Sequence, residues 1–260
     1  MAFTAELWLG WLGQYLWAFL RVSGALLVAP VFGAAVVPVR VKLVLALAVS
    51  VAIAPGLPAT PTPAPFSADG LLTMAAQLLI GLAIGFVAQS VFDALVLAGQ
   101  LIASTMGLGF ASMLDPTRGA ATPVVGQFYL ILGLLLYLAM DGPLVLLGTL
   151  SNSFQWLPVG PAAFDGPGLG LLAGWGSQLF AAGLLIALPA VVALLLVNIA
   201  MGVVSRAAPQ LNLFAVGFPV SLLAGFAVMV LALPALEGAF GRLFVQAIAL
   251  IESASGVGRG

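Results

Sequence analysis

Residues 166–205 read GPGLGLLAGWGSQLFAAGLLIALPAVVALLLVNIAMGVVS, and none of these side chains carries a charge. A helix needs about 20 apolar residues to cross the hydrocarbon core of a membrane, so this run is long enough to do so. Its apolar residues are continuous rather than alternating, which favours a helix over a strand of a membrane barrel. The stretch therefore predicts an all-α, polytopic membrane protein built of long helices and helical hairpins.

The composition of the whole chain supports this interpretation. Of its 260 residues, 63% are apolar and 6% are charged, against roughly 25% charged residues in an ordinary globular domain. So few ionic groups could not cover the surface of a soluble protein, and the chain is expected in lipid or inside a large assembly that takes its place. The net charge of −1 leaves no basic stripe, so no nucleic-acid partner is expected.

Catalysis finds little support in the sequence. The chain has no cysteine and no histidine, which excludes thiolate metal sites and removes the commonest general base. Asp93, Asp115 and Asp141 follow no motif spacing, and no glycine-rich phosphate loop occurs. We therefore expect no catalytic residue, no metal site and no cofactor.

Five further apolar segments are bounded by glycine, proline or charge, at about 7–32, 39–54, 70–106, 124–140 (with a shorter apolar stretch to 154) and 213–236. The segment at 70–106 would be roughly 55 Å long as a helix, which exceeds one bilayer crossing. It is therefore expected to project, tilt strongly or break. Gly81 and Gly85 are candidate break points, and they also form a pair of small residues that lets two helices approach closely.

The last segment is expected to end near residue 236. A mildly amphipathic tail with Glu237, Arg242 and Glu252 follows it. The glycine-rich residues 254–260 are expected to be disordered.

Arg21 and Asp93 are charged residues in the interior of apolar segments. An arginine at mid-membrane costs roughly 2.5–3.5 kcal/mol on insertion scales and usually faces protein or water. The favoured interpretation is structural pairing, with Asp93 as a candidate partner for Arg21. The alternative is that these residues line a path, as the charge relay of a self-contained secondary transporter or channel.

The connection at 107–123, GLGFASMLDPTRGAATP, combines glycines with apolar side chains. Glycine makes the backbone deformable. Irregular backbone at membrane depth survives only where it is buried in protein or lines a cavity. One interpretation is therefore an apolar plug in a pore, and the other is a loop that packs against neighbouring helices. The candidate plug residues are Gly107, Leu108, Gly109, Phe110, Met113, Leu114, Asp115 and Pro116.

The polar connection at 205–212, SRAAPQLN, separates two long apolar runs. Side chains such as Asn198 can form hydrogen bonds between membrane helices, typically worth about 0.6 kcal/mol each. Small residues repeat every four positions after the connection and at Gly170 and Gly174, which favours close helix packing. The sequence leaves open whether this packing lies within the chain or between chains. The candidate packing and assembly residues are Arg206, Pro209, Gln210, Asn212, Gly217, Ser221 and Gly225.

Several blocks occur in a characteristic order along the chain. They are Arg21-x-x-Gly24, Pro30-x-Phe32-Gly33, Pro38-x-Arg40-x-Lys42, Gly107-x-Gly109-Phe110, Asp141-Gly142, Ser205-Arg206-x-x-Pro209-Gln210-x-Asn212 and Gly217-Phe218-Pro219. Together they resemble the FliR family of flagellar export-gate proteins over about residues 10–240. The homologous subunit of virulence secretion systems is similar, and the block around Arg206 favours the flagellar one.

The resemblance implies partners and a role. FliR-like proteins assemble with FliP-like and FliQ-like subunits and contact an FlhB-like switch protein. Their gate lies in the bacterial inner membrane, at the flagellar basal body, and conducts unfolded flagellar export substrates. The resemblance implies that the 107–123 loop plugs this gate. It also implies a FliP-like part at 1–168 fused to a FliQ-like helical hairpin at 169–253, with no enzymatic activity.

Overall fold

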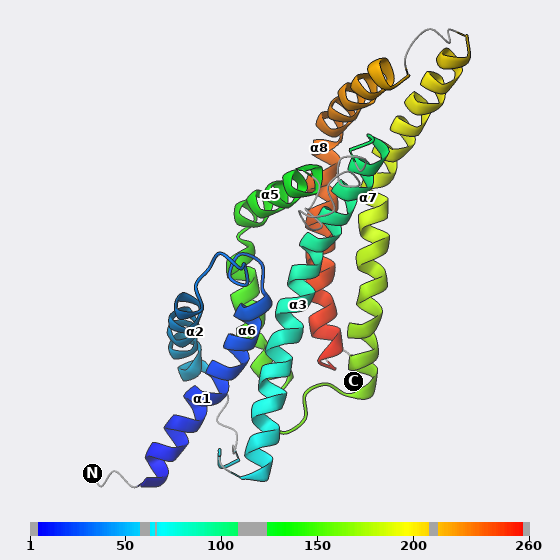
Figure 1. Cartoon of the computed structure of the whole chain (residues 1–260). Helices are drawn as coiled ribbons and strands as arrows, with labels where there is room; N and C mark the ends of the chain where they lie inside the picture. Colours follow the sequence, from blue (N-terminus) through cyan, green and yellow to red (C-terminus); the bar gives the residue numbers. More distant parts are fainter. Residues whose placement is uncertain (1–4, 58–62, 66, 109–123, 208–212, 257–260) are drawn as a thin grey trace. The chain divides into compact units, whose positions relative to one another are not determined.

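A computed structural model of the chain describes residues 5–57, 63–65, 67–108, 124–207 and 213–256, and these ranges contain helices and no strand. The predicted all-α class is confirmed. The helices are α1 (Ala5–Val28), α2 (Val39–Ile53), the short 3-10 helix η1 (Ala54–Gly56), α3 (Ala68–Thr105), α5 (Val124–Ala139), α6 (Gly142–Trp156), α7 (Gly166–Ala207) and α8 (Leu213–Ala254) (Figure 1).

Four of these helices are long and apolar enough to cross a membrane. They are α2 extended by η1, α3, α7 and the part of α8 from Val216 to Ala254. The bent pair of α5 and α6 is a fifth candidate if the two helices count as one span.

The α3 helix is continuous over 38 residues, which excludes one of the three alternatives, the break at Gly81 or Gly85. A glycine inside a helix costs about 1 kcal/mol relative to alanine. That cost is small beside the cost of leaving backbone groups without hydrogen bonds in an apolar medium. The helix therefore continues through both glycines.

The α8 helix continues beyond the apolar segment at 213–236. It reaches Ala254, so the amphipathic tail is the last part of this same helix. The reason is the spacing of Leu236, Phe240, Phe244 and Ile251, which are all buried. These positions fall on one side of a helix, and the continuous apolar stripe keeps the segment helical.

The boundary between α5 and α6 was predicted at Asp141-Gly142-Pro143 and is confirmed. Asp141 has a φ of 54°, in the left-handed region that aspartate adopts more readily than most residues. Pro143 follows in the first turn of α6, where its missing N–H leaves no hydrogen bond unmade. The chain therefore ends one helix and starts the next within three residues.

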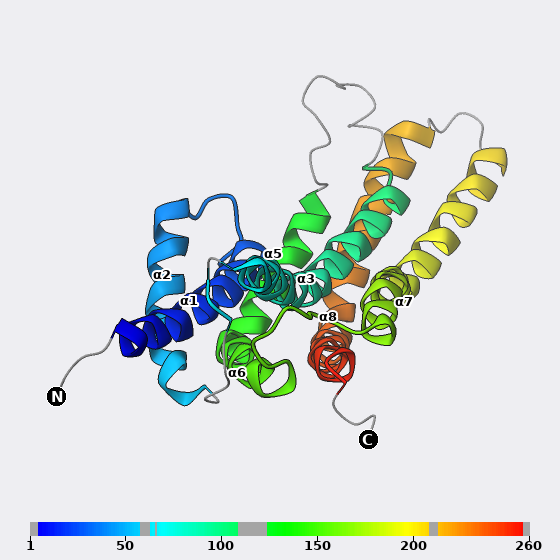
Figure 2. The same ribbon diagram turned by 90° about the horizontal axis from the view of Figure 1, so that it is seen from below.

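The helices pack as two compact units, which are described here one at a time. The first unit comprises Met1–Ser90, Tyr137–Gly176 and Phe244–Gly260. Within it α2 lies beside α1, as both views show (Figures 1 and 2). The rings of Tyr137 and Phe244 meet edge to face at 5.5 Å. The core of the unit includes Trp17, Val22, Ile80, Ile84, Leu150 and Phe154.

The second unit comprises Val91–Leu136 and Ser177–Leu243. In it α5 and α7 both lie close to α3. A Cβ added to Gly99 of α3 would be 2.6 Å from the Cα of Gly126 on α5, and a Cβ on Gly183 of α7 would be 2.9 Å from the carbonyl oxygen of Ala94. The predicted subdivision into 1–168 and 169–253 concerns relatedness to other proteins, and it stays a prediction.

Candidate functional site

Arg21 lies fully buried on α1, inside the first unit. Its Nε donates a 2.8 Å hydrogen bond to Oε1 of Gln77 on α3, and its Nη1 donates to Oγ of Ser153 on α6 at 3.1 Å. Its Nη2 donates to the same Gln77 oxygen and, at 2.8 Å, to the carbonyl oxygen of Leu157. The guanidinium carbon lies 3.9 Å from the centre of the Phe154 ring. One side chain thus joins three helices.

Uncharged groups stabilise the positive charge of Arg21. Leu157 is the C-cap of α6, and the C-terminal end of a helix carries partial negative charge that favours a cation. The face of an aromatic ring attracts a cation as well. Asp93 is exposed, on the part of α3 that belongs to the second unit. The four hydrogen bonds of Arg21 go to neutral acceptors, and the pairing with Asp93 stays a prediction.

Glycines allow α1 and α3 to touch along their backbones near Arg21. A Cβ added to Gly81 would lie 2.0 Å from the carbonyl oxygen of Arg21, and one added to Gly85 would lie 2.5 Å from that of Ala25. On the facing helix, a Cβ at Gly24 would lie 2.6 Å from the carbonyl oxygen of Leu78. No side chain fits at these distances. The predicted close approach at Gly81 and Gly85 is therefore confirmed, and α1 is the neighbouring helix.

In the second unit, α3 ends where the predicted plug connection begins. Gly107 has a φ of 84°, and its N–H donates to the Ser104 carbonyl at 3.1 Å. The N–H of Leu108 donates to the Ala103 carbonyl at 3.0 Å. This pair of hydrogen bonds is the Schellman motif, in which a left-handed glycine terminates a helix. Gly107 therefore redirects the chain out of α3.

The other candidate plug residues, Gly109, Phe110, Met113, Leu114, Asp115 and Pro116, lie outside the described residues. The plug role of the connection stays a prediction.

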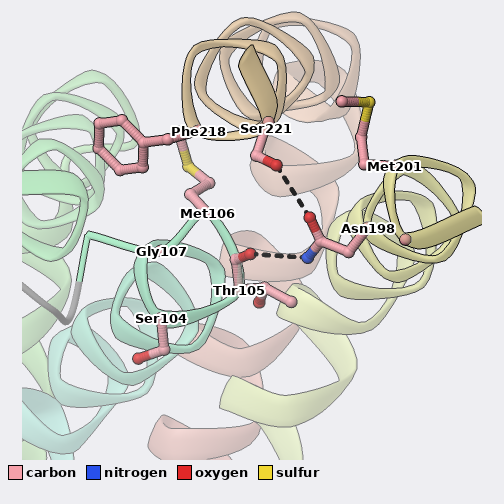
Figure 3. Close-up of a pocket in the computed structure, with 10 residues that line it drawn as sticks. Ser104, Thr105, Met106, Gly107, Asn198, Met201, Phe218 and Ser221 are labelled. Carbon is pink, nitrogen blue, oxygen red and sulfur yellow. Dashed lines mark hydrogen bonds between the residues drawn. The ribbon is translucent and has the colours of Figure 1, made fainter. Parts of the chain in front are cut away.

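Asn198 of α7 links the end of α3 to α8 (Figure 3). Its Nδ2 donates to the carbonyl oxygen of Thr105 at 3.1 Å, and its Oδ1 accepts a 2.8 Å hydrogen bond from Oγ of Ser221. Thr105 is the last residue of α3, and the last carbonyls of a helix have no partner within it. The predicted ability of Asn198 to bond across helices is confirmed.

The seam of small residues on α8 faces the inside of this unit. Gly217, Ser221 and Gly225 are all buried. A Cβ added to Gly225 would lie 2.5–2.6 Å from three side-chain atoms of Met106. The Met106 side chain, itself only 1% exposed, therefore occupies the space that Gly225 leaves on α8.

The remaining assembly candidates differ from this seam. A Cβ added to Gly170 or Gly174 would meet nothing within 4 Å, so neither glycine makes a close approach inside the described chain. Arg206 is exposed in the last turn of α7. Pro209, Gln210 and Asn212 lie outside the described residues. A role of these residues in assembly stays a prediction.

A cavity of about 490 Å³ adjoins the hydrogen bonds of Asn198 (Figure 3). It brings the predicted plug residue Gly107 together with two predicted packing residues, which the sequence did not show. Met201 and Gly202 were not among the predicted site residues, although the spacing of Asn198 and Gly202 places these two residues on one side of α7. The cavity is lined by Ser104, Thr105, Met106, Gly107, Asn198, Met201, Gly202, Gly217, Phe218 and Ser221.

The described residues contain no group of three or more carboxylates that could hold a metal ion. What the two sites can do is hold helices together and fix the end of α3. Fold and sites together define the class of the molecule, an integral membrane protein of long apolar helices joined by a few polar contacts.

Comparison with known proteins gives the family. A family model described as bacterial export proteins, family 1, matches residues 12–247. The flagellar biosynthetic protein FliR of Escherichia coli (strain K12) is 39% identical over 248 residues, which is 95% of each chain. FliR of Pectobacterium carotovorum subsp. carotovorum is 37% identical over 93% of this chain and 92% of its own. FliR of Bacillus subtilis (strain 168) is 30% identical over 83% of this chain and 84% of its own.

The chain belongs to the FliR family of bacterial export proteins. It is accordingly a membrane-embedded component of flagellar protein export.

Proposed function

We propose that the chain is a structural and gating subunit of the flagellar type III export gate, in the bacterial inner membrane at the basal body. It assembles there with FliP-like and FliQ-like subunits and contacts an FlhB-like switch protein. Unfolded flagellar export substrates pass through the gate, and the 107–123 loop closes it. The observation that carries the gating role is the way α3 ends, at a left-handed glycine that leads directly into this loop.

The geometry at this end suits a loop that moves relative to the body of α3. The carbonyl oxygen of Thr105 accepts a hydrogen bond from Asn198, and the side chain of Met106 packs against Gly225. Gly107 comes next, and glycine can change its φ and ψ angles at low cost. A loop that starts at Gly107 can therefore turn aside for a substrate while the body of α3 stays in place.

The outward faces of α7 and α8 support the assembly role. Phe180, Leu223 and Leu231 are 66%, 71% and 80% exposed. Apolar surface of this kind is stable against lipid or against other apolar helices, and not in water. Partner subunits and membrane lipid would both cover it.

The alternative of a self-contained transporter with an Arg21–Asp93 relay has less support. Arg21 is fully buried, and its hydrogen bonds join α1, α3 and α6. A side chain used in this way serves packing. A gate subunit of the proposed kind performs no bond chemistry, so its work requires no catalytic residue.

Deletion of residues 108–116 tests the gating role. The chain is co-expressed with its FliP-like and FliQ-like partners, the complex is purified, and its ion conductance is measured in a planar bilayer. We expect the deletion complex to assemble and to conduct ions in the absence of substrate. A complex lacking residues 58–62, in the connection between α2 and α3, is the control and should stay closed. An assembled 108–116 deletion complex that is as tight as the control would refute the plug.

A further inference from the structure

We propose that Asn198 is a positioning residue that clamps the end of α3 to α7 and α8, and that the adjoining cavity receives this end when the gate opens. This inference rests on the proposed gating function. The contacts of Thr105 and Met106, at the end of α3, would set how firmly the start of the plug loop is held. We call this end of α3 the base of the plug.

The carboxamide of Asn198 uses one donor and one acceptor to connect three helices. Its Nδ2 reaches the last carbonyl of α3, at Thr105, and its Oδ1 is bonded by the hydroxyl of Ser221 on α8. Because both bonds come from one planar group, a shift of α8 turns the amide and weakens the bond to Thr105. The position of the α7–α8 pair is thereby coupled to the end of α3.

The side chain of Met106 makes a second contact at the same end of α3, by packing against α8. Met106 is buried, and its side chain fits against Gly225 of α8, where even a methyl group would collide with it. Met106 lies between Thr105, which Asn198 holds, and Gly107, where the chain turns out of the helix. The base of the plug is therefore fixed on α7 and on α8.

The cavity provides room for a second position. Its volume of about 490 Å³ is that of a small ligand pocket, and it lies directly against Thr105, Met106 and Gly107. Gly202 lines the cavity, and a Cβ added at this position would meet nothing within 4 Å. The end of α3 enters this space when the hydrogen bonds of Asn198 break and Met106 leaves its position against Gly225.

Variants of the clamp and of the cavity should change the gate in opposite ways. Asn198→Leu removes both hydrogen bonds at similar size, and Ser221→Ala removes only the bond to α8. We expect both assembled complexes to show a several-fold higher ion conductance than the native complex in a planar bilayer. Gly202→Val adds a side chain to the lining of the cavity and narrows it, so we expect its conductance to stay low while secretion of flagellar substrates into the medium falls several-fold.

Ser255→Ala is the matched control, because its hydroxyl donates to the carbonyl oxygen of Ile251 one turn earlier in the chain. Both its conductance and its secretion should equal those of the native complex. An assembled Asn198→Leu complex with native conductance overturns the clamp. If that variant does not assemble, Ser221→Ala decides by the same criterion. Gly202→Val with native secretion overturns the role of the cavity.

The deletion of residues 108–116 separates this inference from the function on which it rests. A leaky deletion complex together with a tight Asn198→Leu complex rejects the clamp and keeps the plug. A tight deletion complex rejects the plug, and with it the clamp.

Discussion

Arg21 and Asn198 act in different units but make the same kind of contact, at the scale of single residues. Each donates a hydrogen bond to a backbone carbonyl at the C-terminal end of another helix, Leu157 after α6 and Thr105 at the end of α3. An unpaired carbonyl in an apolar medium costs several kcal/mol. These two polar side chains each supply a hydrogen bond where another helix ends.

The Arg21 contact predicts that Arg21→Lys destabilises the protein. A lysine ammonium cannot form the planar fork that reaches Gln77 and Leu157 together, and it stacks less well on Phe154. Hydrogen bonds to charged groups contribute about 1.5–3 kcal/mol each. For a loss of about 2 kcal/mol, we expect the thermal unfolding midpoint of the purified complex in detergent to fall by roughly 4–8 °C.

Two comparison variants sharpen this prediction. Arg40→Lys changes an exposed arginine and should leave the midpoint unchanged. In Gln77→Glu, a carboxylate replaces an amide whose buried Nε2 has no hydrogen-bond partner among the described residues. That change should raise the midpoint, because the carboxylate pairs with the Arg21 charge. Equal midpoints for Arg21→Lys and Arg40→Lys would contradict the role assigned to Arg21.

At the scale of elements, glycine decides how closely helices meet. Gly81 and Gly85 do not break α3, and instead they admit the backbone of α1. Sequence spacing identified this pair correctly as a packing surface. Spacing alone could not identify which helix covers it, because that contact joins segments about 60 residues apart along the chain.

Gly81→Ala is therefore expected to separate α1 from α3. The added methyl group would lie 2.0 Å from the carbonyl oxygen of Arg21, and overpacking of this kind typically costs about 1–3 kcal/mol. Gly148→Ala in α6 is the matched control, because its methyl group meets nothing within 4 Å and alanine favours a helix by up to about 1 kcal/mol. Unfolding midpoints in detergent should fall for the first variant and hold or rise for the second. The opposite order of the two midpoints would contradict close packing of α1 against α3 at Gly81.

Local signals predicted the helices well and predicted the site only in part. The start of α5 at Val124 and its end near Asp141 follow from proline and glycine at the flanks. The sequence left a break inside α3 open and ended the last apolar segment at about residue 236, whereas burial by distant helices outweighs a local glycine or charge in both places. The meeting of Gly107 with Gly217 had no local signal, because 110 residues separate them. Periodicity could show that each surface exists, and it could not show which surfaces meet.

At the scale of the whole molecule, the spanning helices differ in how much of their surface the chain itself covers. Half of the apolar window of α3 is buried, against 22% for α7 and for α8. A helix that is apolar all round must be covered by lipid or by protein. The chain is therefore incomplete as a water-exposed particle, and partner subunits can supply the missing cover.

Co-expression tests this expectation directly. A tagged chain expressed by itself should give little folded protein in detergent, whereas co-expression with FliP-like and FliQ-like subunits should raise its yield several-fold and bring both along in affinity purification. The measurement is the amount of monodisperse protein by size-exclusion chromatography. Finding the lone chain folded and monodisperse in buffer without detergent would rule out the proposed dependence on partners and lipid.

The free space beside Gly202 allows a label to be attached there that would report opening of the gate. The native chain has no thiol, so Gly202→Cys would create a unique attachment point for a fluorophore or spin label, in a spot where the first atom of a side chain meets nothing. Such a reporter would face the end of α3. Its spectrum should change each time an export substrate enters the gate, so the cavity would provide a direct signal of transport.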